Sequence, residues 1–302
     1  MAIGIQIEHD VRRGIFSGTA GKVLRKATQF ARRKPLGAFG AVVLIVLTVV
    51  GVFADVIAPY DPLKQMVGPQ LGSPSTAHWL GTDNFGRDMF SRIVFGARIS
   101  LLVAVGCTVL VIIPSTILGI ACAYFKGWFD MVFQRVVDAV QAVPGLILLI
   151  TIVSVLGGGM WNVIIALSLP RMITSTRLKR SAALQVSSQD YILAAQASGA
   201  SNWRVMMQHV LPNIIAPIII VISLSFGGYI LAEASLSFLG YGIAPPAPSW
   251  GNMMALDARR FMLTAPHMFW APTIALSLVI FGMNMFGDAV RDVLDPRLRG
   301  SR

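Results

Sequence analysis

Six runs of apolar residues, most of them about as long as a membrane is thick, constrain this chain more than any other feature. A helix needs about 20 mostly apolar residues to cross the hydrocarbon, and it satisfies its own backbone hydrogen bonds there. The runs are Leu36–Ala58, Ser100–Tyr124, Val136–Leu156, Trp161–Ser175, Asn213–Glu233 and Met268–Phe286. The fourth run is the weakest, since Pro170 and Arg171 interrupt it. The sequence therefore predicts an all-α membrane protein with six transmembrane helices.

The composition agrees with this class. Only 13% of the 302 residues are charged and 55% are hydrophobic, whereas soluble domains average about 25% charged residues. The net charge of +11 allows two interpretations, nucleic-acid binding or the basic loops that flank membrane spans. We favour the second and expect no nucleic-acid partner, because the basic residues lie beside the apolar runs.

The distribution of Lys and Arg predicts the orientation in the membrane. In a six-span arrangement, 18 of the 25 Lys and Arg residues fall on the side of the N-terminus, six fall on the other side, and Arg171 lies within a run. Cytoplasmic loops carry the excess of basic residues, so both termini are predicted to be cytoplasmic. The first apolar run begins only at Leu36, too late for a secretory signal, and is predicted to be a retained span.

The runs divide the chain into three parts. We expect a basic cytoplasmic segment over residues 1–35, a transmembrane domain over 36–288 and a cytoplasmic tail over 289–302. The domain is predicted to carry three long loops, which are an outer loop over about 59–98, an inner loop over about 176–212 and a second outer loop over about 240–266.

The inner loop contains the signals of a short helix–turn–helix. Ser187 and Asp190 have the Ser-x-x-Asp spacing of a helix start, and Gly199 suits the left-handed position that ends a helix. Ser201 is expected to cap a second short helix, and Pro212 suits the first turn of the next span.

Apolar side chains on this unit are predicted to be exposed outside the membrane. They are Tyr191, Ile192, Leu193, Trp203 and Met206. An exposed apolar helix fits a groove on a partner protein, or it lies on the lipid headgroups. The physical argument leaves both alternatives open.

The same loop resembles the "EAA" loop of ABC importer permeases. Ala194, Ala195, Gly199, Leu211 and Pro212 match that motif, whereas Leu193 occupies the usual Glu position. The resemblance implies that this loop docks on an ATPase subunit. The docking residues it implies are Asp190, Tyr191, Leu193, Ala194, Ala195, Gly199, Ala200, Trp203, Arg204, His209, Leu211 and Pro212.

Further segments resemble the dipeptide/oligopeptide/nickel group of these permeases and its "C"-type subunit. The matching segments are residues 78–83, 86–92, 233–240, 245–251 and 287–299. The resemblance implies a type I importer permease of the inner membrane that forms half of a pore. It also implies a second permease subunit, two cytoplasmic ATPases and an extracytoplasmic solute-binding protein as partners, besides membrane lipid.

The resemblance makes di- or oligopeptides the expected cargo, with nickel complexes and glutathione as alternatives. It implies that ATP is bound by the partner subunits, so this chain is expected to hold no cofactor and to catalyse no reaction. An ion-coupled carrier without ATPases is the alternative from another class. Such a carrier usually shows inverted repeats and charged sites at mid-membrane, and the sequence offers only a thin set of such charges. A membrane-embedded enzyme is disfavoured because no catalytic constellation stands out.

Other motifs are weak. Residues 16–23 faintly resemble a phosphate loop but lack its first Gly and its final Ser/Thr. The four His residues are scattered, so no metal site is predicted, and Cys107 and Cys122 are expected to be buried packing residues.

Charged residues inside or near spans are costly and often functional. Asp138, Arg171 and Glu233 are therefore candidates for the translocation pathway, and Arg171 is the strongest because helix-breaking Pro170 precedes it. Asp83, Arg87 and Asp88 are instead predicted to form a solvated structural cluster.

Overall fold

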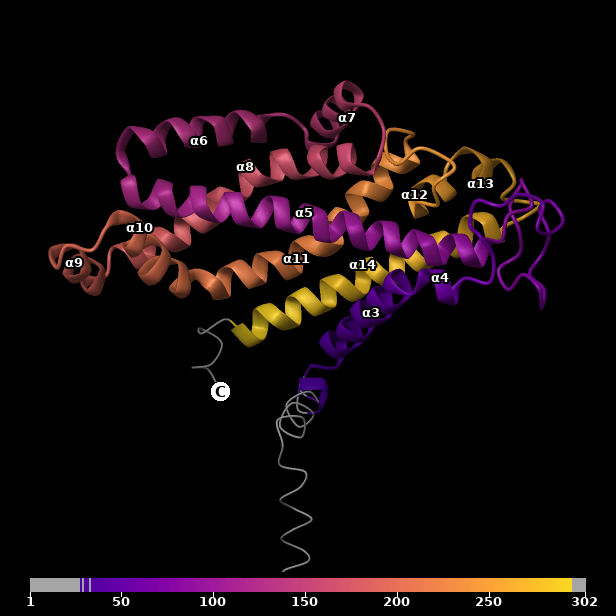
Figure 1. The fold of residues 1–302 in the computed structure, drawn as a ribbon, viewed down its shortest axis with the longest axis horizontal. Helices are drawn as coiled ribbons and strands as arrows, with labels where there is room; N and C mark the ends of the chain where they lie inside the picture. The colour runs from indigo at the N-terminus through magenta and orange to yellow at the C-terminus, as the bar shows by residue number, and fades with distance from the viewer. Residues whose placement is uncertain (1–27, 29, 33, 295–302) are drawn as a thin grey trace, which may run out of the picture.

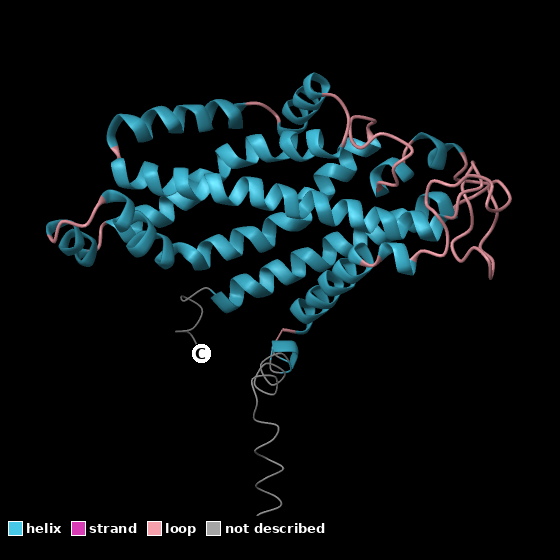
Figure 2. Ribbon diagram, in the orientation of Figure 1, coloured by secondary structure: helices cyan, strands magenta, loops and turns pink. Residues whose placement is uncertain are grey.

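The computed structural model describes residues 28, 30–32 and 34–294, and within them it is built of helices and loops with no extended strand. Residues 16–23, nearly all of the predicted segment 1–35 and most of the predicted tail 289–302 lie outside the described residues. The all-helical class predicted from the apolar runs is confirmed for the described part of the chain (Figure 2).

Four helices are both long and apolar enough to cross a membrane. They are α3 (Pro35–Val52), α5 (Met89–Phe125), α11 (Leu211–Phe238, continuous with the short helices before it) and α14 (His267–Leu294). They correspond to the first, second, fifth and sixth predicted runs. The 37 residues of α5 extend over about 55 Å, and α5 begins before the predicted Ser100, so the first outer loop ends at Asp88 rather than near 98.

The third run is not the single helix that the sequence predicted. It forms α6 (Gly127–Ala142) and α7 (Gly145–Leu156), which meet at an angle of 94°. Pro144 lacks an amide hydrogen and forces the preceding residue out of helical geometry, and Val143 is indeed extended, with φ −87° and ψ 130°.

The fourth run lies in α8 (Met160–Ser187), which continues through Pro170 without a break. Its 28 residues are long enough to span a membrane, but it is less apolar than the four helices above. The described residues therefore contain four candidate spans, or five if the bent pair α6–α7 counts as one. The total of six spans remains a prediction.

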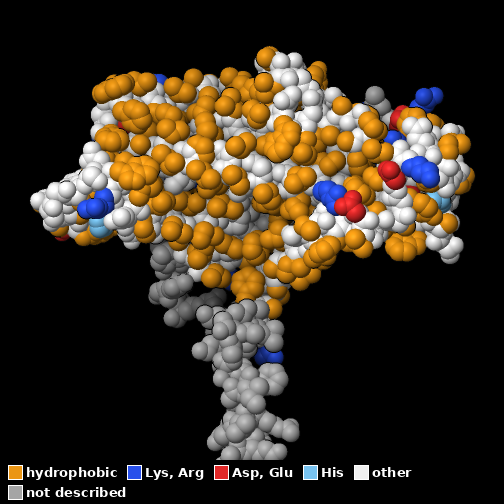
Figure 3. All heavy atoms as spheres, viewed as in Figure 1, with side chains coloured by type: hydrophobic (Ala, Val, Ile, Leu, Met, Phe, Trp, Pro, Cys, Tyr) orange, Lys and Arg blue, Asp and Glu red, His pale blue; other side chains and the backbone are white. Residues whose placement is uncertain are grey.

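The long helices lie side by side, and the loops gather at opposite ends of the bundle (Figure 1). One end holds the inner helices α9 (Asp190–Ala197) and α10 (Asn202–Arg204). The other holds the segment 58–88 that precedes α5, together with α12 (Trp250–Met253) and α13 (Leu256–Arg260). A four-residue helix, α4 (Ala54–Ile57), follows α3. Apolar side chains cover most of the visible surface between the two ends (Figure 3), as expected for a surface that faces lipid.

Close approach between helices depends on small residues. A Cβ added to Gly40 of α3 would lie 2.2 Å from the carbonyl oxygen of Gly282 in α14. A Cβ added to Gly119 of α5 would lie 2.9 Å from the Cβ of Lys179 in α8. Small residues let helix backbones pack closely in membranes, and they do so here at both contacts.

The outer charged cluster is structural, but it is buried rather than solvated as predicted. Asp83 is 3% exposed and accepts hydrogen bonds from the backbone amide of Arg87 at 2.9 Å and from its Nε at 2.6 Å. Asp88 is fully buried and accepts from the amide of Ser91 at 2.7 Å, which caps α5. The ring Nδ1 of His78 lies 2.9 Å from the other oxygen of Asp88. This cluster fixes the outer segment to the start of α5.

We predict that Asp83→Ala loosens the outer segment. Arg87 and Arg92 are both buried beside Asp83, with Arg92 Nε 3.7 Å from its Oδ2. Removing one partner of a buried ion pair typically costs about 3–5 kcal/mol. Limited proteolysis of the purified protein should therefore cut residues 59–88 faster in the variant.

The matched control for this prediction is Asp61→Ala. Asp61 is exposed, and its carboxylate accepts one local hydrogen bond, from the amide of Leu63 at 2.8 Å. Its loss should leave the cleavage rate close to that of the wild type. Equal cleavage of the Asp83→Ala protein and the wild type would show that the cluster does not hold the segment.

Candidate functional site

The inner end of the bundle carries a compact two-helix unit, which we call the inner unit and define as residues 188–210. It contains α9, the turn at Gly199, α10 and one π-helical turn over Val205–Val210 that leads into α11. α8 runs to Ser187, so the loop predicted over 176–212 is shorter than expected. Pro212 lies in the first turn of α11, as predicted.

The turn between the two short helices depends on Gly199. Its φ is +81°, a conformation that glycine adopts without strain. The amide of Gly199 donates to the carbonyl of Gln196 at 2.9 Å, and the amide of Ala200 donates to that of Ala195 at 3.1 Å. This is the Schellman pattern of a helix end, and it confirms the left-handed position predicted for Gly199.

The caps of the inner unit differ in how well the sequence predicted them. Ser201 caps α10 as expected, accepting from the amide of Arg204 at 3.4 Å. Ser187 does not begin α9, because it is the last residue of α8, and the N-cap of α9 is Gln189 without a side-chain hydrogen bond. The predicted helix start is confirmed, since α9 begins at Asp190, but the capping role of Ser187 was wrong.

One face of the inner unit is buried against the ends of the long helices. Ile192 is 1% exposed and Val205 is fully buried, and both belong to one buried cluster with Ala183 of α8 and Ile120 near the end of α5. Met206 is also buried in this cluster, so the predicted exposure of Ile192 and Met206 was wrong. The apolar face of a short helical unit packs against the ends of longer helices when these lie next to it.

The opposite face of the inner unit is exposed and carries large side chains. Tyr191, Leu193 and Trp203 are 46%, 57% and 61% exposed. The predicted docking residues therefore lie together at one end of the molecule. The exposed ones are Asp190, Tyr191, Leu193, Ala194, Gly199, Trp203, Arg204 and Pro212, and the half-buried ones are Ala195, Ala200, His209 and Leu211.

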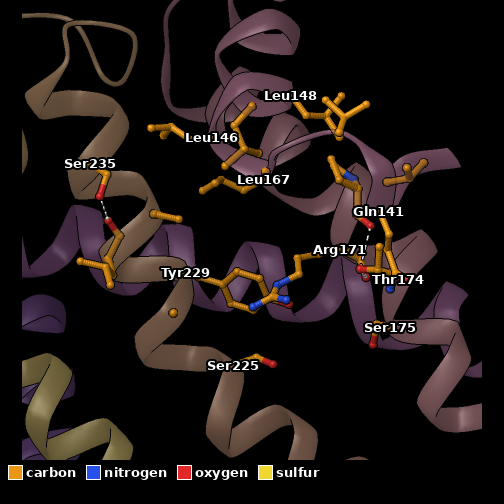
Figure 4. A pocket seen from close by; sticks show the side chains of 18 of the residues that line it. Gln141, Leu146, Leu148, Leu167, Arg171, Thr174, Ser175, Ser225, Tyr229 and Ser235 are labelled. Atoms are coloured by element: carbon orange, nitrogen blue, oxygen red, sulfur yellow. Dashed lines mark hydrogen bonds between the residues drawn. The ribbon is translucent and has the colours of Figure 1, made fainter. Parts of the chain in front are cut away.

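A cavity of about 740 Å³ opens between α6–α7, α8 and α11 (Figure 4). Its volume lies within the range of small-molecule sites, about 300–1,000 Å³. Apolar side chains, among them leucines of α7 and α8, form most of its wall, and a few hydroxyl and amide groups lie between them. The polar lining residues besides Arg171 are Gln141, Thr174, Ser175, Ser225, Tyr229 and Ser235.

Of the three pathway candidates, Arg171 alone lines this cavity. Asp138 lies outside it on α6, paired with Arg177 and with the Nη1 of Arg135 at 3.2 Å. Glu233 is fully buried, and its Oε1 accepts from Ser237 and Ser249 at 2.7 Å each. It ties α11 to the second outer loop.

Sequence reasoning missed the polar lining of α11. Ser225, Gly228, Tyr229, Ala232 and Ser235 follow one another at spacings of one or three residues, so they share one face of the helix. This stripe of small and polar residues lies within an otherwise apolar run, and it was the signal from which the cavity lining of α11 could have been predicted.

The described residues contain no group of three His, Cys, Asp or Glu side chains able to hold a metal ion. Cys107 and Cys122 are both buried and free. The chemistry at the two sites is therefore that of exposed apolar side chains at the inner end and of one guanidinium among hydroxyls in the cavity.

Comparison with known proteins gives two family matches. Residues 115–300 match the family described as the inner membrane component of binding-protein-dependent transport systems. Residues 24–74 match the N-terminal transmembrane domain of oligopeptide transport permease C.

Curated relatives agree with both matches. The dipeptide transport system permease protein DppC of Alkalihalophilus pseudofirmus is 37% identical over 281 residues, covering 93% of this chain and 92% of the relative. The glutathione transport system permease protein GsiD of Pectobacterium atrosepticum is 37% identical over 272 residues, covering 90% of each protein. GsiD of Escherichia coli O157:H7 is 39% identical over 270 residues, covering 89% of each.

The comparisons and the helical bundle confirm the resemblance found in the sequence. The chain belongs to the inner-membrane components of binding-protein-dependent transport systems, and it is a multi-pass, C-type permease subunit of an ABC importer in which separate subunits hydrolyse ATP.

Proposed function

We propose that this permease imports di- or oligopeptides, forms half of a translocation pathway with a different second permease subunit, and docks on an ATPase through its inner unit. The observation that carries the docking proposal is the two-sided construction of that unit. Tyr191, Leu193 and Trp203 are exposed on one side, while Ile192 and Val205 are buried against the spans on the other. A surface of this kind suits an apolar groove on a partner.

The proposed mechanism moves the inner unit with the ATPase to which it is docked. ATP binding closes the two ATPases, and the inner units follow. Because the inner unit contacts the ends of α5, α8 and α11 through buried side chains, its displacement shifts those helices and favours the outward-facing state. ATP thus acts as a ligand that biases a two-state equilibrium.

Peptides are the proposed cargo because one relative is a dipeptide permease. Glutathione is the second candidate, because several relatives of similar identity are glutathione permeases. The cavity of about 740 Å³ offers room for either solute. Binding measurements on the cognate binding protein separate the two, since that protein is expected to set much of the selectivity.

Purification of the intact complex tests the proposal against the ion-coupled alternative. An importer of the proposed kind should co-purify with two ATPase chains and a second, different permease chain, and uptake into proteoliposomes should require ATP and the binding protein. Uptake driven by an ion gradient without ATP would contradict the proposal.

We predict that Gly199→Val breaks docking while the protein still reaches the membrane. Apart from the adjoining residues, no heavy atom of the described residues lies within 4 Å of a Cβ built on Gly199, so the change introduces no clash. It places a β-branched residue at φ +81°, which costs on the order of 1–2 kcal/mol. The turn should shift and move Trp203 out of register with Tyr191. Co-purified ATPase, uptake and substrate-stimulated ATP hydrolysis should fall together at near-normal protein abundance.

Gly240→Val is the matched control for this substitution. Gly240 has φ +85°, has no atom within 4 Å of an added Cβ, and ends α11 with the same pair of backbone hydrogen bonds. The Gly240→Val substitution introduces the same backbone strain at the opposite end of the molecule. The complex that contains this variant should therefore keep its ATPase subunits. Equal loss of ATPase from both variants would show that strain in general, and not the inner turn, is responsible.

We propose that both termini are cytoplasmic, which places the inner unit on the cytoplasmic side. Ser75 and Ser188 are both exposed. Ser75 belongs to the segment 58–88 and Ser188 directly precedes α9, and that segment and α9 lie at opposite ends of the bundle (Figure 1). In a protein without Cys107 and Cys122, single cysteines at these two positions should react with an impermeant thiol reagent from opposite sides of the membrane. Ser188→Cys should react only from the cytoplasmic side, and labelling of both from one side would contradict the orientation.

A further inference from the structure

The cavity between α6–α7, α8 and α11 contains one charged side chain. Among the described residues that line it, Arg171 is the only one that carries a charge. Its guanidinium extends from α8 toward Tyr229 of α11 (Figure 4). An added Cβ at Gly228 would lie 4.0 Å from its Nη2, so the guanidinium reaches the bare backbone of α11. The positive charge is thus presented inside the cavity.

No carboxylate within residues 34–294 forms an ion pair with Arg171. Two other cations on α8 do have acidic partners, because Arg177 pairs with Asp138 and Arg180 Nε donates to Asp130 at 2.5 Å. Lys179 is buried and donates instead to the hydroxyls of Ser115 and Ser175. Within the described part of the chain, the cavity therefore lacks an acidic group that neutralises the guanidinium.

A lone guanidinium at this depth needs a reason. Arg171 lies 11 residues beyond Met160, where α8 begins, which is about 17 Å along the helix. Charged side chains at the middle of a membrane are expensive, and they generally face water or an oppositely charged group. A guanidinium that lines the cavity and has no acidic partner among the described residues is available to bind an anion there.

The surroundings favour a planar anion over a bulky or metallic ligand. A guanidinium donates two parallel hydrogen bonds that match the two oxygens of a carboxylate. Thr174, Ser175 and Ser225 add hydroxyl groups, and the wall from Leu146 to Leu149 is apolar, which suits the remainder of a small organic solute. A carboxylate held by Arg171 with its organic part against the leucines fits this arrangement.

We propose that Arg171 binds a carboxylate of the transported solute and so selects solutes that end in a free carboxylate. The inference rests on the proposed function, in which the cavity is part of the translocation pathway. It names a chemical group that the two candidate cargoes share, because a dipeptide and glutathione both carry an α-carboxylate that is ionised at neutral pH. An acidic side chain of the second permease subunit is the competing source of the same group.

The test combines a change in the protein with a change in the solute. The complete importer, reconstituted in proteoliposomes with its binding protein, is assayed with a dipeptide and with the same dipeptide as its C-terminal amide. Arg171→Gln should lower kcat/KM for uptake of the free dipeptide by about tenfold or more, and change uptake of the amide less than twofold. Arg171→Lys keeps the charge but loses the fork of donors, so its effect should be intermediate.

Each variant is compared with the wild type on the same solute, so discrimination by the binding protein cancels. Arg135→Gln is the matched control, because it removes one positive charge from an exposed position on α6 that does not line the cavity. It should change uptake of both solutes less than twofold. ATP hydrolysis without solute should be the same in all three variants.

Two results would overturn the inference. Equal losses for acid and amide in Arg171→Gln would show that the guanidinium does not contact the carboxylate. Loss of the second permease subunit from the purified Arg171→Gln complex would assign the carboxylate to that subunit instead. If the importer carries glutathione but no dipeptide, this result contradicts the proposed cargo and not the role of Arg171. The Arg171→Gln comparison would then be made with glutathione and its amide.

Discussion

The proposed coupling depends on one apolar contact, the cluster that joins the inner unit to the ends of the long helices. Ile192 and Val205 belong to one buried cluster that also contains Ile120 and Ala123 of α5 and Ala183 of α8. Full burial of an aliphatic side chain contributes about 1.5–3 kcal/mol, and close-packed side chains transmit displacement instead of absorbing it. The inner unit is therefore positioned to move together with the spans. A displacement of its exposed face is passed to the spans through this contact.

The outer end of the bundle is held in a different way, by buried polar groups. Glu233 gathers the hydroxyls of Ser237 and Ser249, and the indole of Trp250 donates to the carbonyl of Ile93 in α5 at 3.0 Å. These bonds fix the second outer loop to two spans. Between the two fixed ends, α6 and α7 bury only Val137 and Val153 among their described side chains. The cavity thus has one loosely covered wall, as expected if a second permease subunit completes it.

The sequence was a reliable guide wherever a local rule decided the structure. The apolar runs predicted helices, and Gly199, Ser201 and Pro212 lie where helix-end chemistry requires them. It failed where tertiary packing decided. The exposure of Ile192 depended on the ends of α5 and α8, which no local pattern reveals, and the Ser187 signal was overridden because α8 continued to that residue.

The charged residues show the same limit of prediction from sequence. Asp138, Arg171 and Glu233 look alike in the sequence, as single charges near apolar runs. The structure separates them by their partners, since Asp138 pairs with arginines, Glu233 is bonded to serines and Arg171 faces the cavity. The roles of these residues depend on partners that are distant in sequence. The bend at Pro144 places α7 beside the cavity, and its only signal in the sequence was the effect of a proline on the residue before it.

The most direct test of the coupling contact is the number of solute molecules imported per ATP hydrolysed by a complex that carries Ile192→Ala. The substitution opens a cavity beneath the inner unit while Tyr191, Leu193 and Trp203 remain available for docking. The account predicts that the ATPases stay bound and continue to hydrolyse ATP, while the number of molecules imported per ATP falls severalfold. An unchanged ratio at normal complex abundance would show that the spans do not depend on this contact to follow the ATPases.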